Sequence, residues 1–151
     1  MDMNGATAIV TGGSEGIGRS IAEELIRCGA EVMITARRED LLKETAGEIG
    51  AQYFVADVSQ EADCVQTINT FMEKQGRLDI LVNNAGFGIF KPLVDMDRQS
   101  FDSVFATNVT GAMLMGREAA KIFVKQNSGN MVNISSTSGL SGHKNGTAYS
   151  A

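Results

Sequence analysis

The sequence contains no tryptophan, one proline, one histidine and two cysteines among its 151 residues. Cys28 and Cys64 lack metal-ligand spacing and a second cysteine pair, so we expect free thiols in a reducing compartment and no metal site. No apolar stretch is long enough to span a bilayer, and the first residues lack the cationic flank of a secretion signal. We therefore expect a cytoplasmic protein without a membrane partner.

An excess of positive charge is also missing. Thirteen lysines and arginines stand against 18 acidic residues, for a net charge of -5, and no basic stripe is visible. This balance argues against nucleic acid as a partner. The 43% hydrophobic and 21% charged content is that of an ordinary globular chain. Repeats, linkers and low-complexity tracts are absent, so we expect one domain over residues 1–151.

Short apolar strand patterns alternate with amphipathic helix patterns along the chain. The strands are predicted at residues 6–10, 31–36, 52–56, 78–83 and 130–135. The helices are predicted from about residue 17, over 40–49 and 60–75, and as one long helix over about 98–126. This alternation predicts an α/β fold, a Rossmann-type doubly wound parallel sheet with strand order 3-2-1-4-5. Ligands of such sheets bind beyond the carboxyl ends of the strands.

A glycine-rich turn, TGGSEGIG at residues 11–18, joins the first strand to the first helix. Gly12, Gly16 and Gly18 allow a tight bend and bring free N–H groups close to a bound pyrophosphate. The N-terminus of the helix adds about half a positive charge. An ordinary strand-to-helix turn is the alternative, but the strand before and the helix after favour a dinucleotide phosphate site.

Further motifs follow at the ends of the later strands: Asp57, then Asn83-Asn84-Ala85-Gly86, Asn108, and Ser136 with Tyr149 thirteen positions later. In this order, and together with the glycine turn, the chain resembles the short-chain dehydrogenase/reductase family, in its compact single-domain branch. The resemblance covers essentially the whole sequence. It implies hydride transfer between a nicotinamide cofactor and a carbonyl or alcohol substrate.

The resemblance implies a cofactor-binding set and a catalytic set. The cofactor-binding set comprises Gly12, Ser14, Gly16, Ile17, Gly18, Arg37, Asp57, Val58, Asn84, Ala85 and Gly86. In the catalytic set, Tyr149 is the acid/base, Ser136 stabilises the substrate oxygen, and Asn108 holds a water of the proton relay. From the residues alone, Asp57 could instead cap a helix, Asn108 could kink one, and Tyr149 could pack in the core. Asn83 is expected to tie two strands together.

The end of the second strand indicates the cofactor. An acidic residue there would bind the 2′-hydroxyl of the adenosine ribose, but this chain has Ala36 followed by Arg37 and Arg38. A guanidinium binds a 2′-phosphate through charge-assisted hydrogen bonds, so we predict NADP(H), with Arg37 in contact and Arg38 solvated. A carboxylate at Glu15 in the glycine turn would weaken phosphate binding, which keeps NAD(H) as the alternative.

The sequence ends at Ala151, two positions before the lysine that the family carries four residues after its tyrosine. We therefore expect a Rossmann domain that is incomplete at its C-terminus, lacks the last strands of the family fold, and belongs to a longer reductase. The complete chain is expected to form a homo-oligomer, a dimer or tetramer, partly through its long helix. A nucleotide-binding module without catalysis and a structural subunit are the alternatives.

Overall fold

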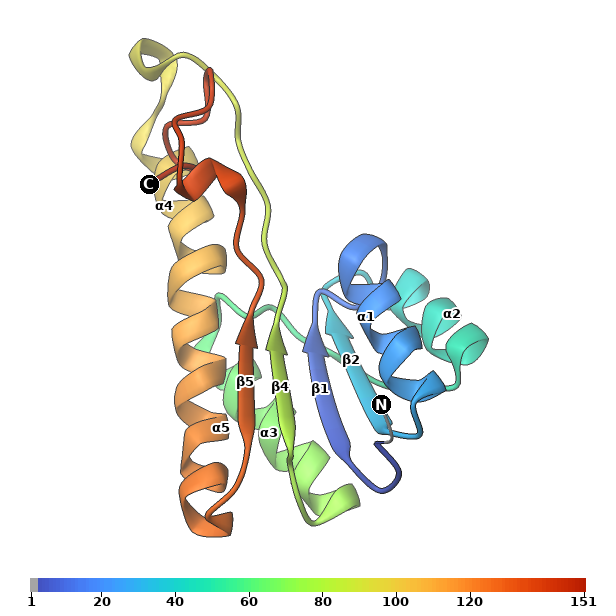
Figure 1. The fold of residues 1–151 in the computed structure, drawn as a ribbon. Coiled ribbons are helices and arrows are strands. Elements are labelled where there is room, and N and C mark those ends of the chain that lie inside the picture. The colour runs from blue at the N-terminus through green and yellow to red at the C-terminus, as the bar shows by residue number, and fades with distance from the viewer. Residues whose placement is uncertain (1–2) are drawn as a thin grey trace.

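The computed structural model describes residues 3–151, and in this range strands and helices alternate along the chain (Figure 1). The strands are β1 (Thr7–Thr11), β2 (Glu31–Ala36), β3 (Gln52–Val55), β4 (Ile80–Asn83) and β5 (Asn130–Asn133). The helices are α1 (Gly16–Arg27), α2 (Glu39–Ile49), α3 (Glu61–Gln75), α4 (Arg98–Phe105) and α5 (Ala112–Gln126). Shorter helical turns are η1 (Leu93–Asp95), η2 (Ala106–Gly111) and η3 (Thr137–Gly139).

The five strands form one parallel sheet in the order β3-β2-β1-β4-β5, which confirms the predicted strand order. In the register of β1 against β2, Thr11 lies opposite Thr35, and in that of β1 against β4, Val10 lies opposite Val82. The order reverses between β1 and β4. Two chain segments therefore leave the sheet in different directions at that point, and a crevice opens between them.

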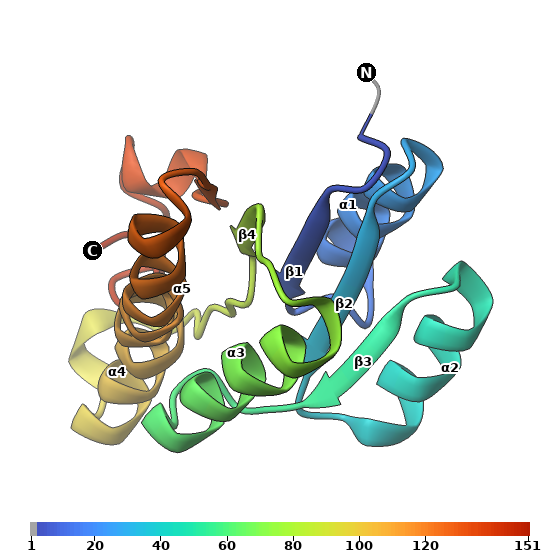
Figure 2. The ribbon, with the colours of Figure 1, turned by 90° about the horizontal axis from the view of Figure 1, so that it is seen from below.

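Helices cover the sheet on both faces, with α1 and α2 on one side and α3, α4 and α5 on the other (Figure 2). Ala8 and Val10 pack with the first layer, whereas Ile9 packs with the second. All five residues of β1 are buried, because the strand has a neighbour on each side and helices above and below. This double burial explains why the strand reads as a continuous apolar run.

Three predicted elements differ from the structure by two residues or more, and one of them is the strand predicted at residues 78–83, which begins at Ile80. The strand predicted at residues 130–135 ends at Asn133, because its single neighbour β4 offers its last pairing position at Asn83. The long predicted helix is divided by η2, a π-helical turn, into α4 and α5. Helical periodicity alone does not distinguish a π turn from an α turn, because the insertion adds only one residue per turn.

Beyond the sheet, the chain after β4 and the chain after β5 run side by side towards the same end of the molecule (Figure 1). The backbone N–H of Lys91 donates to the carbonyl of Asn145 at 2.9 Å and joins the two segments. None of the helices in residues 3–151 combines the length and the apolar character needed to cross a bilayer.

Candidate active site

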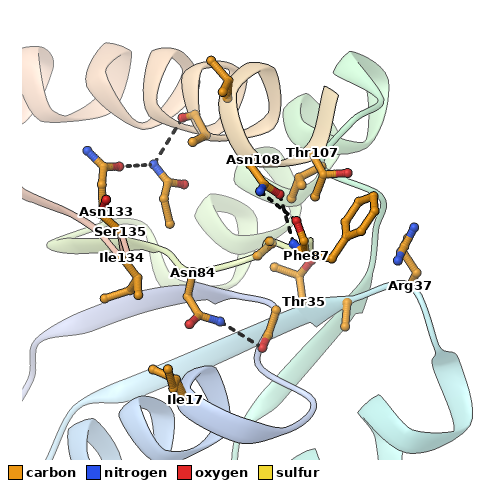
Figure 3. A pocket seen from close by; sticks show the side chains of 18 of the residues that line it. Ile17, Thr35, Arg37, Asn84, Phe87, Thr107, Asn108, Asn133, Ile134 and Ser135 are labelled. Atoms are coloured by element: carbon orange, nitrogen blue, oxygen red, sulfur yellow. Dashed lines mark hydrogen bonds between the residues drawn. The ribbon is translucent and has the colours of Figure 1, made fainter. Parts of the chain in front are cut away.

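A cavity of about 600 Å³ lies at the carboxyl ends of the strands, where β1 and β4 diverge (Figure 3). Most of the predicted site residues line it: Gly12, Ser14, Ile17, Arg37, Asp57, Val58, Asn84, Ala85, Gly86, Asn108, Ser136 and Tyr149. Gly16 and Gly18 are the predicted members that do not. Residues from both halves of the chain therefore meet in one cavity of a size common for small-molecule sites.

The geometry of the glycine turn explains why glycine, and no larger residue, occupies positions 16 and 18. Gly12 and Gly16 have φ values of +65° and +58°, in the left-handed region that favours glycine. A Cβ on Gly18 would lie 2.3 Å from the carbonyl oxygen of Gly12, so Gly18 brings α1 against the preceding turn. Its contribution is close packing of helix and turn, not a surface of the cavity.

Thr11 and Asn84 join the ends of β1 and β4 beneath the cavity. The Thr11 hydroxyl accepts from the backbone N–H groups of Asn84 and Ala85, each at 3.0 Å. The Asn84 side-chain amide donates to the carbonyls of Thr11 and Gly12, at 2.9 and 3.1 Å, and Figure 3 draws one of these two bonds. Asn84 thus braces the glycine turn as well as lining the cavity. Sequence reasoning assigned no role to Thr11, because its partners lie far away in the chain.

Asn83 ties the last two strands together, as predicted. Its amide nitrogen donates to the side-chain oxygen of Asn133 on β5 at 2.9 Å and to the carbonyl of Ala112 at 3.2 Å. These bonds connect β4 to its neighbouring strand and to the beginning of α5. Hydrogen bonds therefore hold together the base of the cavity wall that lies beside the catalytic candidates.

The two arginines after β2 have different partners. Arg38 forms an ion pair with Glu15, so the carboxylate of the glycine turn meets a cation. Arg37 is 63% exposed, and its Nη1 lies 4.0 Å from Oδ2 of Asp57. The Arg37 guanidinium also lies 5.9 Å from the centre of the Phe87 ring. Arg37 is therefore the cation with the looser ion pair, and it borders the cavity.

Asp57 has a local structural contact at the end of β3. Its Oδ1 accepts from the backbone N–H and the hydroxyl of Ser59, at 2.9 and 2.8 Å. This is a side-chain-closed turn before α3, and it is not the helix cap that the residues allowed as an alternative, because α3 begins at Glu61 with Gln60 as its N-cap residue. Oδ2 is the oxygen closer to Arg37, so Asp57 borders the same part of the cavity as the arginine.

The three catalytic candidates reach the cavity from two separate segments. Asn108 lies in the π turn η2, Ser136 precedes η3 and accepts from the backbone N–H of Ser138 at 3.1 Å, and Tyr149 follows later in the same segment. The Tyr149 ring packs against Phe90 with 5.5 Å between ring centres. The predicted grouping of these side chains around one cavity agrees with the structure, whereas their chemical roles stay predictions.

The Asn108 side chain is held by the backbone of Phe87. Its oxygen accepts from the Phe87 N–H at 3.0 Å, and its nitrogen donates to the Phe87 carbonyl at 2.9 Å (Figure 3). A water in contact with Asn108 would have to use the remaining amide hydrogen, the second lone pair or the backbone. Phe87 was missed by sequence reasoning, because its contacts come from two distant segments.

Cys64 lies behind the wall of the cavity. Its thiol donates to the carbonyl of Val58 at 3.2 Å, and it is 1% exposed. Burial, followed by the nearby carboxylates of Asp63 and Asp57, raises the pKa of the Cys64 thiol to about 11. The thiolate is the reactive form, so Cys64 is an inert core residue here.

The residues present fit a dinucleotide. The cavity runs from Arg37 past the glycine turn to Ser136 and Tyr149, so one elongated molecule could contact all of them. A Cβ on Gly16 would meet no atom within 4 Å, which leaves open space beside the turn. Within residues 3–151, no group of three metal-ligating side chains is close enough to hold a metal ion.

Comparison with known proteins agrees with this geometry. A family model described as short chain dehydrogenase matches residues 6–151. A tropinone reductase homologue from Arabidopsis thaliana is 38% identical, with 99% of this chain and 58% of the relative aligned. Sorbitol dehydrogenase from Cereibacter sphaeroides is 35% identical, with 94% of this chain and 57% of the relative aligned.

A solved structure of NAD+-bound xylitol dehydrogenase superimposes with a TM-score of 0.94 at 30% identity, covering 99% of this chain and 60% of that one. The chain thus spans somewhat more than half the length of the relatives that it matches. The family match extends over the strands, the glycine turn and the residues that line the cavity. The chain belongs to the short-chain dehydrogenase family of oxidoreductases.

Proposed function

We propose that residues 1–151 form the dinucleotide-binding domain of an NADP(H)-dependent oxidoreductase that interconverts a carbonyl and an alcohol. The observation that supports this proposal is the continuous cavity, which has Arg37 at one end and Ser136 and Tyr149 at the other. An extended cofactor could bind its phosphates at the glycine turn and still bring its nicotinamide to the catalytic candidates. The family uses nicotinamide cofactors, which agrees with this assignment.

Arg37 favours NADP(H) over NAD(H). Arg38 pairs with Glu15, so the carboxylate that would repel a 2′-phosphate already has a cationic partner. Arg37 keeps only a 4.0 Å ion pair with Asp57 among the described residues, and its guanidinium is largely exposed at the cavity edge. The xylitol dehydrogenase neighbour binds NAD+, so NAD(H) is the alternative for this chain.

When bound, the nicotinamide supplies or accepts the hydride at the substrate carbon. The chain's own residues handle the oxygen and the proton. We propose that the Ser136 hydroxyl donates a hydrogen bond to the substrate oxygen, where negative charge grows during reduction. Tyr149 gives its phenolic proton to that oxygen, or takes it back in the oxidation direction. Asn108 positions the loop at Phe87 through its two hydrogen bonds. We propose that it also borders the path by which the proton is replaced.

The proposed substrate is a small carbonyl or alcohol compound. We further propose that the complete chain forms a dimer or tetramer. Apolar side chains are exposed on α5, where Met113 is 53% exposed and Val124 is 80% exposed. Burial of such side chains against a second copy would stabilise an assembly.

Tyr149→Phe, made in the complete longer chain, tests the reaction. We expect the variant to lose at least about 100-fold in turnover, because removal of a general acid typically costs two to four orders of magnitude. Its affinity for NADPH should stay unchanged, because the hydroxyl meets the substrate oxygen and not the phosphates. The measurement is NADPH oxidation with a panel of cyclic ketones and keto sugars, together with calorimetric titration of NADPH.

Tyr53→Phe is the matched control, because Tyr53 is the second of the two tyrosines and lies on the edge strand β3, away from the cavity. It should keep full turnover. Equal turnover of the Tyr149→Phe variant and the parent protein would remove Tyr149 from the mechanism. Saturable NADPH binding by a protein that reduces no member of the panel would favour a nucleotide-binding module without catalysis.

A further inference from the structure

Phe87 connects two parts of the site that lie far apart in the sequence. Its backbone N–H and carbonyl are both bound by the amide of Asn108, at 3.0 and 2.9 Å. These two bonds fix the position of the Phe87 backbone relative to the helical segment that carries Asn108. Phe87 itself is only partly exposed.

From this fixed backbone, the Phe87 ring lies near the guanidinium of Arg37 at the cavity edge (Figure 3). The distance from the guanidinium carbon to the ring centre is 5.9 Å, within the range of an attractive cation–π contact. Arg37 lies on the other side of the sheet's switch point, immediately after β2. The aromatic contact therefore spans the cavity mouth from the β4 side to the β2 side.

Apart from the Phe87 ring, few contacts restrain the Arg37 side chain. Its charged partner among residues 3–151 is Asp57, at 4.0 Å, and 63% of its side chain is exposed. A long exposed arginine side chain samples many rotamers, and ordering it on a ligand costs conformational entropy. A ring that already restrains the guanidinium at the cavity edge reduces that cost.

We propose that Phe87 is a specificity-determining residue, whose ring positions Arg37 so that the site prefers a cofactor with a phosphate on the adenosine ribose. The proposal depends on the proposed function, since it assigns to Phe87 a part in the choice of cofactor. Phe87 acts through Arg37 and is therefore a positioning residue. An exposed cation–π contact is worth about a two- to fivefold change in affinity, which sets the expected effect.

A direct contact between the Phe87 ring and the adenine would have a different signature. NADPH and NADH carry the same adenine, so loss of that contact would weaken both cofactors equally. Loss of a restraint on Arg37 weakens NADPH alone, because only NADPH carries the phosphate that the guanidinium would bind. The ratio of the two affinities therefore distinguishes the two roles.

The experiment is a double-mutant cycle with Phe87→Leu and Arg37→Ala, in which NADPH and NADH are titrated by calorimetry. Phe87→Leu should weaken NADPH about two- to fivefold and leave NADH unchanged. In the Arg37→Ala background, the same substitution should have no further effect on NADPH. Phe87→Tyr keeps the ring and should preserve the parent affinities.

Phe90→Leu is the matched control. Phe90 lies in the same segment and packs against His143 and Tyr149, and within residues 3–151 the cation–π contact of Arg37 is with Phe87 and not with Phe90. It should leave the NADPH to NADH ratio unchanged. Equal weakening of both cofactors by Phe87→Leu, or the same loss with and without Arg37, would overturn the positioning role.

The outcome of Arg37→Ala alone separates this inference from the proposed cofactor. If Arg37→Ala weakens NADPH and NADH equally, the preference for NADP(H) is wrong, whatever Phe87 does. If Arg37→Ala weakens NADPH binding alone and Phe87→Leu changes neither affinity, only the role of Phe87 is wrong.

A nuclear magnetic resonance spectrum of the unliganded protein gives a test without substitution: the Arg37 side-chain protons should be shifted upfield by the Phe87 ring. Shifts equal to those of an exposed arginine would contradict the contact.

Discussion

At the scale of single residues, the glycines of the turn differ in what they make possible. Gly12 and Gly16 adopt positive φ values, so they form the bend itself. Gly18 has ordinary helical geometry, but an added Cβ would lie 2.3 Å from the Gly12 carbonyl oxygen and 2.4 Å from the Asn84 amide nitrogen. Those two atoms form one of the hydrogen bonds that brace the turn. The packing of α1 against the turn therefore depends on the absence of a side chain at position 18.

Gly18→Ala should lower the free energy of unfolding by about 1–3 kcal/mol, the usual cost of an extra methyl group in a tightly packed site. The turn would also move away from Asn84, so NADPH binding should weaken with it. Denaturant unfolding followed by circular dichroism measures the first effect, and calorimetry the second.

Gly47→Ala is the control for this prediction. Gly47 lies in the interior of α2, and a Cβ there would meet nothing within 4 Å. This change should leave the protein equally stable or stabilise it by roughly 0.5–1 kcal/mol, because alanine favours the helix. If Gly18→Ala behaved like Gly47→Ala, close packing at the turn would not explain the third glycine.

How far such residues could be predicted depends on where their partners lie. The glycine turn could be interpreted from the sequence because its strand, bend and helix are contiguous. Arg37 was predicted from its place at the end of a strand. The partners of Thr11 and Phe87 come from other segments, and no local pattern indicates them.

At the scale of elements, β1 and β4 are joined at both ends. The Thr11 hydroxyl connects them at the cavity, and Asp79 connects them at the opposite end of the sheet. Oδ2 of Asp79 accepts from the Thr7 backbone N–H at 3.0 Å and from the Thr7 hydroxyl at 3.2 Å. Arg77 adds hydrogen bonds to both Asp79 oxygens, the shortest at 2.6 Å.

The Asp79 carboxylate is largely buried, with 15% of its side chain exposed. Burial by itself raises the pKa of Asp79, but the hydrogen bonds from Arg77 and Thr7 outweigh it, so the pKa lies below its ordinary value. A carboxylate with a lowered pKa stabilises the fold above its unfolded-state pKa, and that contribution is lost as the pH falls through the folded-state value.

Asp79→Asn should therefore lower the free energy of unfolding at neutral pH by about 1.5–3 kcal/mol, the range for hydrogen bonds to a charged group. The difference from the parent protein should narrow as the solution is acidified below the ordinary aspartate pKa of about 3.9. Urea unfolding at a series of pH values measures both effects.

Asp102→Asn is the corresponding control, because Asp102 pairs with Arg98 on the surface of α4, where the two side chains are 51% and 88% exposed. Removal of such an exposed pair should change stability little at any pH. The role of the ionised carboxylate would be contradicted if the difference in free energy of unfolding between Asp79→Asn and the parent protein stayed constant through the acid range.

The element boundaries that sequence reasoning missed have physical causes. An edge strand is as long as its single neighbour allows, so the end of β5 depends on β4 and not on its own residues. The π turn in the long helix lies where Asn108 turns towards Phe87, a tertiary contact that the helical pattern does not encode. Such turns are frequent at functional sites, which agrees with the position of Asn108 on the cavity.

At the scale of the whole molecule, the strand order could be predicted because short right-handed crossovers leave few topologies open. The reversal of that order between β1 and β4 places the crevice, and the crevice gathers residues that are distant in the sequence. The existence and position of the cavity were thus predictable. The pairing of charges across it, such as Arg38 with Glu15, was not, because it depends on side-chain conformations.

The most direct test of the proposed function is a crystal structure of the protein grown with NADPH in excess. We predict that the diphosphate lies against the backbone N–H groups of residues 12–18, that the 2′-phosphate contacts Arg37, and that the nicotinamide lies beside Ser136 and Tyr149. A cavity that stays empty or is filled by side chains at saturating NADPH, or a nucleotide bound at another surface, would contradict the account.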